Sequence, residues 1–216
     1  MRSQSFRIRT GNFILRAEHA LRRLLPMRRM NAASAERNYS FNNGRDIRSR
    51  TVNDQSDGKN TGVALLRLGD TVMKESGCEV IAAYNALLLL GRPVSFADTA
   101  RLFEEKGCLM RFPFVKYGTL GVNPYDIGGV MESCGIACSH ADPKQMCSDG
   151  LYIISYWNSP KLKDGLHTIT VRTTDGICCT YNYTMRGHSG SVMPASDFLE
   201  TFSAGYITGY RLDLKH

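Results

Sequence analysis

From about residue 62 onward, apolar and polar residues follow regular patterns that turn signals separate. Helical spacing, with a capping residue before or a glycine after, marks residues 77–90, 96–106 and 124–134. Alternation or short apolar runs then predict strands at 151–157, 166–173 and 177–183, a helix at 195–202 and a strand at 205–212. Because helices come first and hairpin-linked strands second, the sequence predicts an α+β fold with an antiparallel sheet.

The helix at 77–90 is apolar on nearly every face and carries Cys78 in its first turn. Ser76 and Glu79 match the S-x-x-E capping box, and Gly91 supplies the stop signal. Free N–H groups and the positive end of the helix dipole favour a thiolate there. A neighbouring Glu79 carboxylate raises the thiol pKa unless the capping box occupies it. The pattern predicts a nucleophilic cysteine, and the alternative is an ordinary buried thiol.

His167 opens the second predicted strand, and Asn182 lies near the end of its hairpin partner. A short turn at 174–176 can bring the two residues side by side across the ladder. An amide oxygen that accepts from one imidazole nitrogen leaves the other nitrogen free to take a thiol proton. The alternatives are a surface histidine and an ordinary turn asparagine, and His188 in the following loop is a rival base.

A helix headed by cysteine, followed by an antiparallel sheet with His and then Asn, resembles the papain-like cysteine peptidase fold. Within that fold the chain is most similar to the bacterial bacteriocin-processing branch, the double-glycine leader peptidases. The resemblance covers roughly residues 65 to 212. The strings that carry it are residues 76–87, 118–128, 154–158, 165–169 and 181–182.

The resemblance implies hydrolysis of a peptide or amide bond through a thioester acyl-enzyme. By position, Cys78 is then the nucleophile, His167 the general base and later acid, and Asn182 the orienting group. We expect the substrate to lie against Gly77, Gly121, Asn123 and Trp157. Two alternatives stay open: acyl transfer to an amine by the same triad, and a catalytically inactive peptide-binding module of the same fold.

Residues 1–60 hold 13 Lys and Arg against 5 Asp and Glu, whereas the other 156 residues hold 14 and 15. We expect this basic segment to be largely disordered, with an amphipathic helical pattern at 12–25 that Pro26 ends, and we expect the peptidase domain to span 61–216. A basic amphipathic helix can contact an anionic membrane or a partner; the alternatives are a solvated tail and an upstream start codon, with Met27, Met30 or Met73 as the other possible starts. No specific nucleic-acid partner is expected, because the domain itself is nearly neutral.

Seven cysteines, two of them adjacent, with no secretory signal peptide before them, predict a reducing, cytoplasmic setting. A set of four residues could in principle ligate zinc, but its spacing matches no familiar knuckle, so we expect structural thiols, no metal and no cofactor. No apolar run reaches the roughly 18 residues that span a bilayer. The four residues are Cys134, Cys138, His140 and Cys147.

Overall fold

A computed structural model describes residues 5–24, 27–45, 50–56, 62–92, 94–112, 114–185 and 188–215, with the backbone alone at 27–31, 184–185 and 188–190. Its centre is a six-stranded sheet in the order β3-β8-β4-β5-β6-β7, and every neighbouring pair is antiparallel. The strands are β3 (Ile136–His140), β4 (Gly150–Trp157), β5 (Leu166–Thr174), β6 (Ile177–Met185), β7 (His188–Pro194) and β8 (Tyr206–Leu214).

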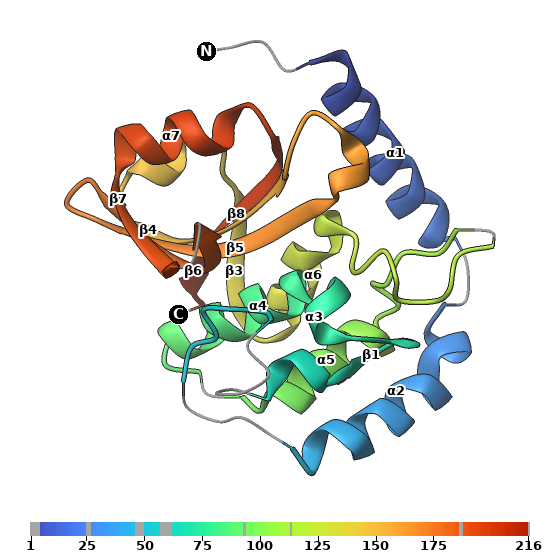
Figure 1. Cartoon of the computed structure of the whole chain (residues 1–216). Coiled ribbons are helices and arrows are strands. Elements are labelled where there is room, and N and C mark those ends of the chain that lie inside the picture. Colours follow the sequence, from blue (N-terminus) through green and yellow to red (C-terminus); the bar gives the residue numbers. More distant parts are fainter. Residues whose placement is uncertain are drawn as a thin grey trace.

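Helices cover both faces of this sheet (Figure 1). On one face, α4 (Cys78–Leu89) packs on β5, α6 (Ile127–Ser133) packs on β3, and α5 (Phe96–Glu105) packs on α4. On the other face, α7 (Ala195–Ser203) lies over β6 and β7. Two apolar cores result, and the period-2 alternation of β4 feeds both of them: Leu151 and Ile153 enter the α4 core, and Tyr152, Ile154 and Tyr156 enter the α7 core.

The β5–β6 turn shows how local chemistry sets this sheet. Asp175 and Gly176 occupy the turn with φ of 50° and 74°, between the paired residues Thr174 and Ile177. Positive φ at both central positions matches the twist of the flanking strands, and Asp-Gly is a preferred sequence for it. The register of β5 against β6 is therefore fixed by two residues.

Several predicted elements are confirmed. The helices at 77–90 and 96–106 are α4 and α5, and the Ser95 hydroxyl caps α5 by accepting from the Asp98 N–H. The segment 124–134 divides into a 3₁₀ turn, η2 (Pro124–Asp126), followed by α6. The predicted strands correspond to β4, β5, β6 and β8, and the predicted helix at 195–202 is α7. The sequence patterns did not predict β3 or β7.

The expected disorder of residues 1–60 is wrong for the part that the structure describes. Two 17-residue helices form there, α1 (Phe6–Arg22) and α2 (Met27–Asn43), and α2 packs on α5. Asn38 of α2 donates to the Gly69 backbone oxygen at 2.8 Å. These helices are anchored by polar contacts to distant residues, which apolar periodicity does not reveal.

Residues 50–56 are also part of the fold. Asn85, fully buried in α4, accepts from the Val52 N–H and donates to the Val52 oxygen, both at 2.8 Å. Val52 itself is completely buried. The boundary expected at residue 60 therefore does not separate a tail from a domain in the described regions.

The remaining short elements connect these layers. They are η1 (Val63–Leu65), β1 (Arg67–Leu68), β2 (Thr71–Val72), α3 (Met73–Ser76), η3 (Gln145–Cys147) and η4 (Leu162–Asp164). Among the helices that the structure describes, none has the length and apolar character needed to cross a membrane.

Candidate functional site

Cys78 is the first residue of α4 and follows a close helix-to-helix junction at Gly77. A Cβ at Gly77 would lie 2.1 Å from the Met73 sulfur and 2.7 Å from the Met73 oxygen, so only glycine fits this junction. Gly77 is also the N-cap, without a side-chain cap. The predicted Ser76–Glu79 capping box is therefore wrong: Ser76 ends α3, and its buried hydroxyl has no hydrogen-bond partner in the described chain.

Glu79 is fully buried directly beside the cysteine. Its Oε1 accepts from the Thr168 hydroxyl at 3.3 Å, and that hydroxyl is 2.8 Å from the Ser155 hydroxyl. Its Oε2 has no hydrogen-bond partner among the described residues and faces Gly121, where a Cβ would lie 3.4 Å away. Burial raises the pKa of Glu79 to about 7.

The Cys78 side chain is 6% exposed. Burial and the neighbouring Glu79 raise the pKa of its thiol well above the ordinary value. The neighbouring polar groups of Thr168 act in the opposite direction and lower the thiol pKa. Because the raising effects are larger, this arrangement disfavours the thiolate.

His167 and Asn182 do meet, but not as predicted. The His167 Nε2 lies 2.6 Å from the backbone oxygen of Asn182. A carbonyl can only accept, so Nε2 carries the proton and Nδ1 is the free acceptor of the neutral ring. Burial lowers the pKa of His167. The Asn182 side chain is not the orienting group: its buried Nδ2 has no partner in the described chain.

The backbone of Asn182 explains how its oxygen reaches the histidine. Asn182 has φ of 63°, in the left-handed region that asparagine adopts more readily than most residues. Regular β5–β6 pairing stops at Thr170 and Tyr181, and the β6–β7 register shifts between Thr180 and Thr184. This bulge turns the Asn182 oxygen toward His167.

Strand alternation separates His167 from Cys78. Thr168 and Thr170 point toward α4, where their hydroxyls contact Glu79 and the Ala82 oxygen. His167 is one residue earlier, so its side chain leaves the opposite face of β5. There it contacts the ring of its cross-strand partner Tyr156, which stacks on Phe202 of α7. No hydrogen bond joins Cys78 to His167 in the described structure.

An apolar cavity of about 310 Å³ reaches Cys78 and Glu79. Of the four predicted substrate-binding residues, Gly121 and Trp157 line it, whereas Gly77 and Asn123 do not. Asn123 is instead a buried structural group: its Oδ1 caps η2, and its Nδ2 donates to the Leu15 oxygen and to Glu18. The remaining lining residues are Gly11, Ile14, Leu15, Glu75, Ser76, Met110, Phe112, Thr119, Leu120, Leu162, Gly165 and Leu166.

Helix α1 forms one wall of this cavity and is held there by polar contacts. Asn12 accepts from the Trp157 indole N–H at 2.8 Å and donates to the Tyr206 oxygen at 3.1 Å. Arg22 is buried and pairs with Glu18 and with Asp126. Sequence analysis missed this wall, because its signals are single polar residues whose partners are far away in the chain.

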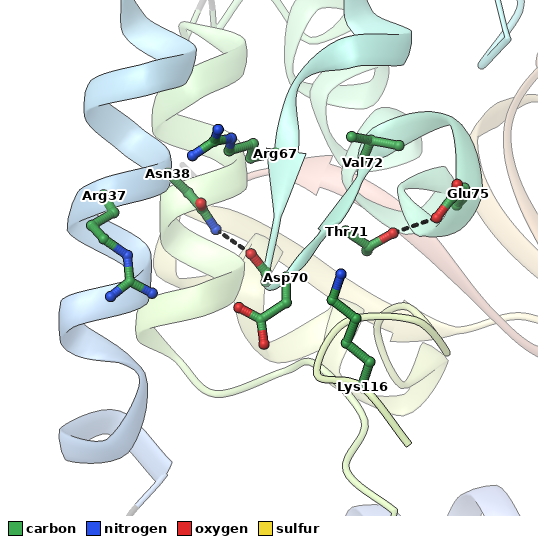
Figure 2. A pocket seen from close by; sticks show the side chains of 9 residues that line it. Arg37, Asn38, Arg67, Asp70, Thr71, Val72, Glu75 and Lys116 are labelled. Carbon is green, nitrogen blue, oxygen red and sulfur yellow. Dashed lines mark hydrogen bonds between the residues drawn. The ribbon is translucent and has the colours of Figure 1, made fainter. Parts of the chain in front are cut away.

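A second, larger pocket of about 560 Å³ lies between α2 and the β1–β2 turn (Figure 2). Figure 2 shows Arg37, Asp70 and Lys116 around it. The Thr71 hydroxyl donates to Glu75 at 2.6 Å at its edge. Its lining contains no cysteine or histidine, so the chemistry expected from the sequence belongs to the first cavity.

The four residues considered as zinc ligands do not form a metal-binding cluster in the structure. They are Cys134, Cys138, His140 and Cys147. All seven cysteines are free thiols, and no three His, Cys, Asp or Glu side chains of the described residues gather closely enough to hold a metal ion. His140 stacks against Tyr210, with ring centroids 5.0 Å apart. The side chain of the rival base His188 lies outside the described residues.

A scan against protein-family models, a search of curated proteins and a search of solved structures each found no match to this chain.

Proposed function

We propose that this protein is a cysteine-dependent hydrolase of amide or related acyl bonds, of the papain-like type, with Cys78 as nucleophile. The observation that carries the proposal is the place of Cys78: it is the first residue of a buried helix and lines an apolar cavity. Free N–H groups of the first helical turn can donate to the oxyanion that forms when sulfur attacks a carbonyl. The neighbouring polar groups of Thr168 also favour the thiolate.

In the proposed reaction, the Cys78 proton passes to Nδ1 of His167 and the sulfur bonds to the carbonyl carbon. The carbon–nitrogen bond then breaks, and the amine leaves with the proton returned by the imidazolium. Water hydrolyses the thioester, which releases the acid and restores the thiol. In the resting arrangement the Asn182 oxygen holds Nε2–H, so it supplies the orientation first assigned to the Asn182 amide.

This reaction requires His167 to turn toward the sulfur, because the resting arrangement has no hydrogen bond between them. The distance in the chain is short: Thr168, which influences the pKa of Cys78, follows His167 directly in β5. Hydrogen bonds of catalytic groups are commonly long in unliganded enzymes and tighten when substrate binds. The raised thiol pKa therefore describes a resting state in this proposal.

A non-catalytic binding module of the same fold is the second candidate. Two observations favour it: the thiol pKa is raised, and His167 lies on the opposite face of β5 from α4. In this case the apolar cavity binds a ligand and Cys78 is a buried core residue.

Acylation by p-nitrophenyl acetate distinguishes the two functions. If Cys78 is the nucleophile, p-nitrophenolate is released and an acetyl group stays on Cys78. Peptide mass spectrometry after acid quenching detects this acetyl group. We expect Cys78→Ala to abolish the release and His167→Ala to slow it by about a hundredfold or more. Cys178, fully buried in the α7 core, is the matched internal control and should stay unmodified. If Cys78 is acylated no faster than Cys178, the hydrolase proposal fails and the binding module remains.

A further inference from the structure

Helix α1 has two different faces. Ile8, Leu15 and Arg22 recur every seven residues on the inner face and are between 2% and 5% exposed. Seven residues are close to two helical turns, so these side chains form one row against the domain. This row and the Asn12 contacts account for how α1 is held.

The opposite face carries large apolar side chains that contact solvent. Phe6 is 77% exposed, Phe13 70%, Leu21 65% and Leu24 81%. Phe6 and Phe13 are seven residues apart and share one side of the helix, Leu21 lies beside them, and Leu24 follows in the turn that ends α1. We call these four residues the outer stripe. Single exposed apolar residues are ordinary, but three on one helix with a fourth in the turn that follows it mark an interaction surface.

The exposed charged side chains of α1 and its C-cap have one sign. Arg7, Arg9 and Arg23 are exposed and form no ion pair with another described residue, and Arg16 is exposed beside Tyr125. Glu18 is the helix's one acidic residue, and it is turned inward, 8% exposed, against Arg22. The solvent side of α1 therefore presents arginines and apolar groups with no carboxylate between them.

A neighbouring loop continues this surface. Leu120 is 42% exposed and Ile14 of α1 44%, and both line the Cys78 cavity. In the same loop, Phe114 is fully exposed and Val115 is 41% exposed. Figure 1 shows the loop beside the C-terminal end of α1. The apolar surface thus extends from the outer stripe to the edge of the cavity.

We propose that the outer stripe of α1 docks on an anionic lipid surface. An amphipathic helix that lies in the membrane interface places its aromatic and aliphatic side chains among the acyl chains and its arginines at the headgroups. Charge complementarity favours anionic lipid, because the exposed charged residues of α1 and its C-cap are arginines. A second copy of the chain fits poorly, because antiparallel or parallel pairing would place arginines against arginines.

Co-sedimentation of the full chain with vesicles tests the proposal. The probes are vesicles of zwitterionic phosphatidylcholine and vesicles that also contain about a third of phosphatidylserine, at low and high salt. The outer-stripe variant carries Phe6→Gln, Phe13→Gln and Leu24→Gln, which keep good helix formers on the exposed face. The matched control carries Ile177→Thr and Val192→Thr, two exposed apolar positions of the β6–β7 hairpin. Circular dichroism of each variant shows whether α1 and the sheet are retained.

We expect the unaltered chain and the control to bind the anionic vesicles at low salt. The outer-stripe variant should bind at least about tenfold more weakly, as should Arg9→Gln with Arg23→Gln. The proposal is overturned if anionic vesicles are not bound at low salt, or if the outer-stripe variant binds as the control does. It is equally overturned if the stripe instead drives self-association, seen in analytical ultracentrifugation as an oligomer that the variant abolishes while vesicle binding is absent.

Discussion

Gly11 of α1 lies against the indole of Trp157 at a distance that leaves no room for a side chain. A Cβ at this position would be 2.7 Å from Cζ2 of the indole and 2.9 Å from a Leu162 methyl group. The contact belongs to the wall of the Cys78 cavity, since all three residues line it. The close packing of α1 on the domain therefore requires glycine at position 11.

Gly11→Ala should loosen α1, although alanine is the better helix former. Intrinsic propensity gains about 1 kcal/mol, but the methyl group must displace the indole ring and the helix. We expect a lower free energy of unfolding in urea and faster alkylation of Cys78 by iodoacetamide. The control is Gly129→Ala in α6, where a Cβ meets nothing within 4 Å, and it should raise stability by up to about 1 kcal/mol. Equal effects of the two substitutions would contradict the tight seating of Gly11.

Glu79→Gln should remove a pH dependence of stability. The folded-state pKa of Glu79 is raised from 4.5 to about 7, so the folded protein binds more protons than the unfolded chain between these values. Stability from this group is therefore greatest below pH 4.5 and falls as the pH rises to about 7, by at most roughly 3 kcal/mol. Urea unfolding at several pH values should show this loss in the unaltered chain relative to Glu79→Gln. The two curves would run parallel if Glu79 titrated normally, and half-exposed Glu105→Gln is the control for a less buried carboxylate.

The same substitution should lower the pKa of the Cys78 thiol, because the Glu79 charge contributes to its elevation. The pH profile of Cys78 alkylation should shift to lower pH in Glu79→Gln, with the half-buried thiol Cys134 unchanged as the internal reference. If the carboxylate were the base that activates the thiol, alkylation near neutral pH would slow instead. The direction of the shift therefore decides which group activates the cysteine.

Asn182 should tolerate glycine better than any branched side chain. Its φ of 63° suits glycine, and its contact with His167 uses the backbone oxygen, which glycine retains. We expect Asn182→Gly to keep the Nε2–H tautomer of His167, read from the imidazole nitrogen shifts by NMR. Asn182→Val should cost about 1 to 2 kcal/mol in the free energy of unfolding, because a β-branched residue is strained at this φ. Loss of the tautomer in Asn182→Gly would show that the amide side chain is needed after all.

Asn85→Leu should be among the more destabilising substitutions. It leaves the buried N–H and oxygen of Val52 without the partners that Asn85 supplies at 2.8 Å. Two unsatisfied buried backbone groups cost about 2 to 5 kcal/mol together. Urea unfolding measures this loss. Asn53→Leu, at the residue after Val52, serves as the control. A loss below about 1 kcal/mol would show that the residue 50–56 segment contributes little to the fold.

Four strands of the sheet and its central helix were predictable because their signals are local. The apolar run from Val80 to Leu87 and the Asp175-Gly176 turn each determine one element without help from distant residues. The α+β class follows from their order. Helix α1 overlaps the amphipathic pattern expected at 12–25, but its docking on the domain had no local signal: its inner face includes Asn12 and Arg22, which are stable there because Trp157 and Asp126 are positioned to bind them.

The candidate site was predictable in its residue types and only partly in its geometry. Cys78 at a helix start and the contact of His167 with Asn182 both follow from spacing. Side chains of β5 alternate between its two faces, so the face of one residue fixes the faces of its neighbours. The buried polar pair Thr168 and Thr170 carries that information, since their hydroxyls need partners and find them on α4. Since Thr168 and Thr170 face α4, His167 lies on the opposite face of β5.

Trp157 gives the chain a built-in optical reporter. It is the only tryptophan among the 216 residues, and its indole lies under Gly11 with its N–H on Asn12. Its emission and its quenching by acrylamide therefore report one event, the contact of α1 with the domain. Since the outer stripe and the cavity wall are opposite sides of that helix, a single unlabelled fluorescence titration with vesicles would reveal whether lipid docking leaves the cavity covered or uncovers it.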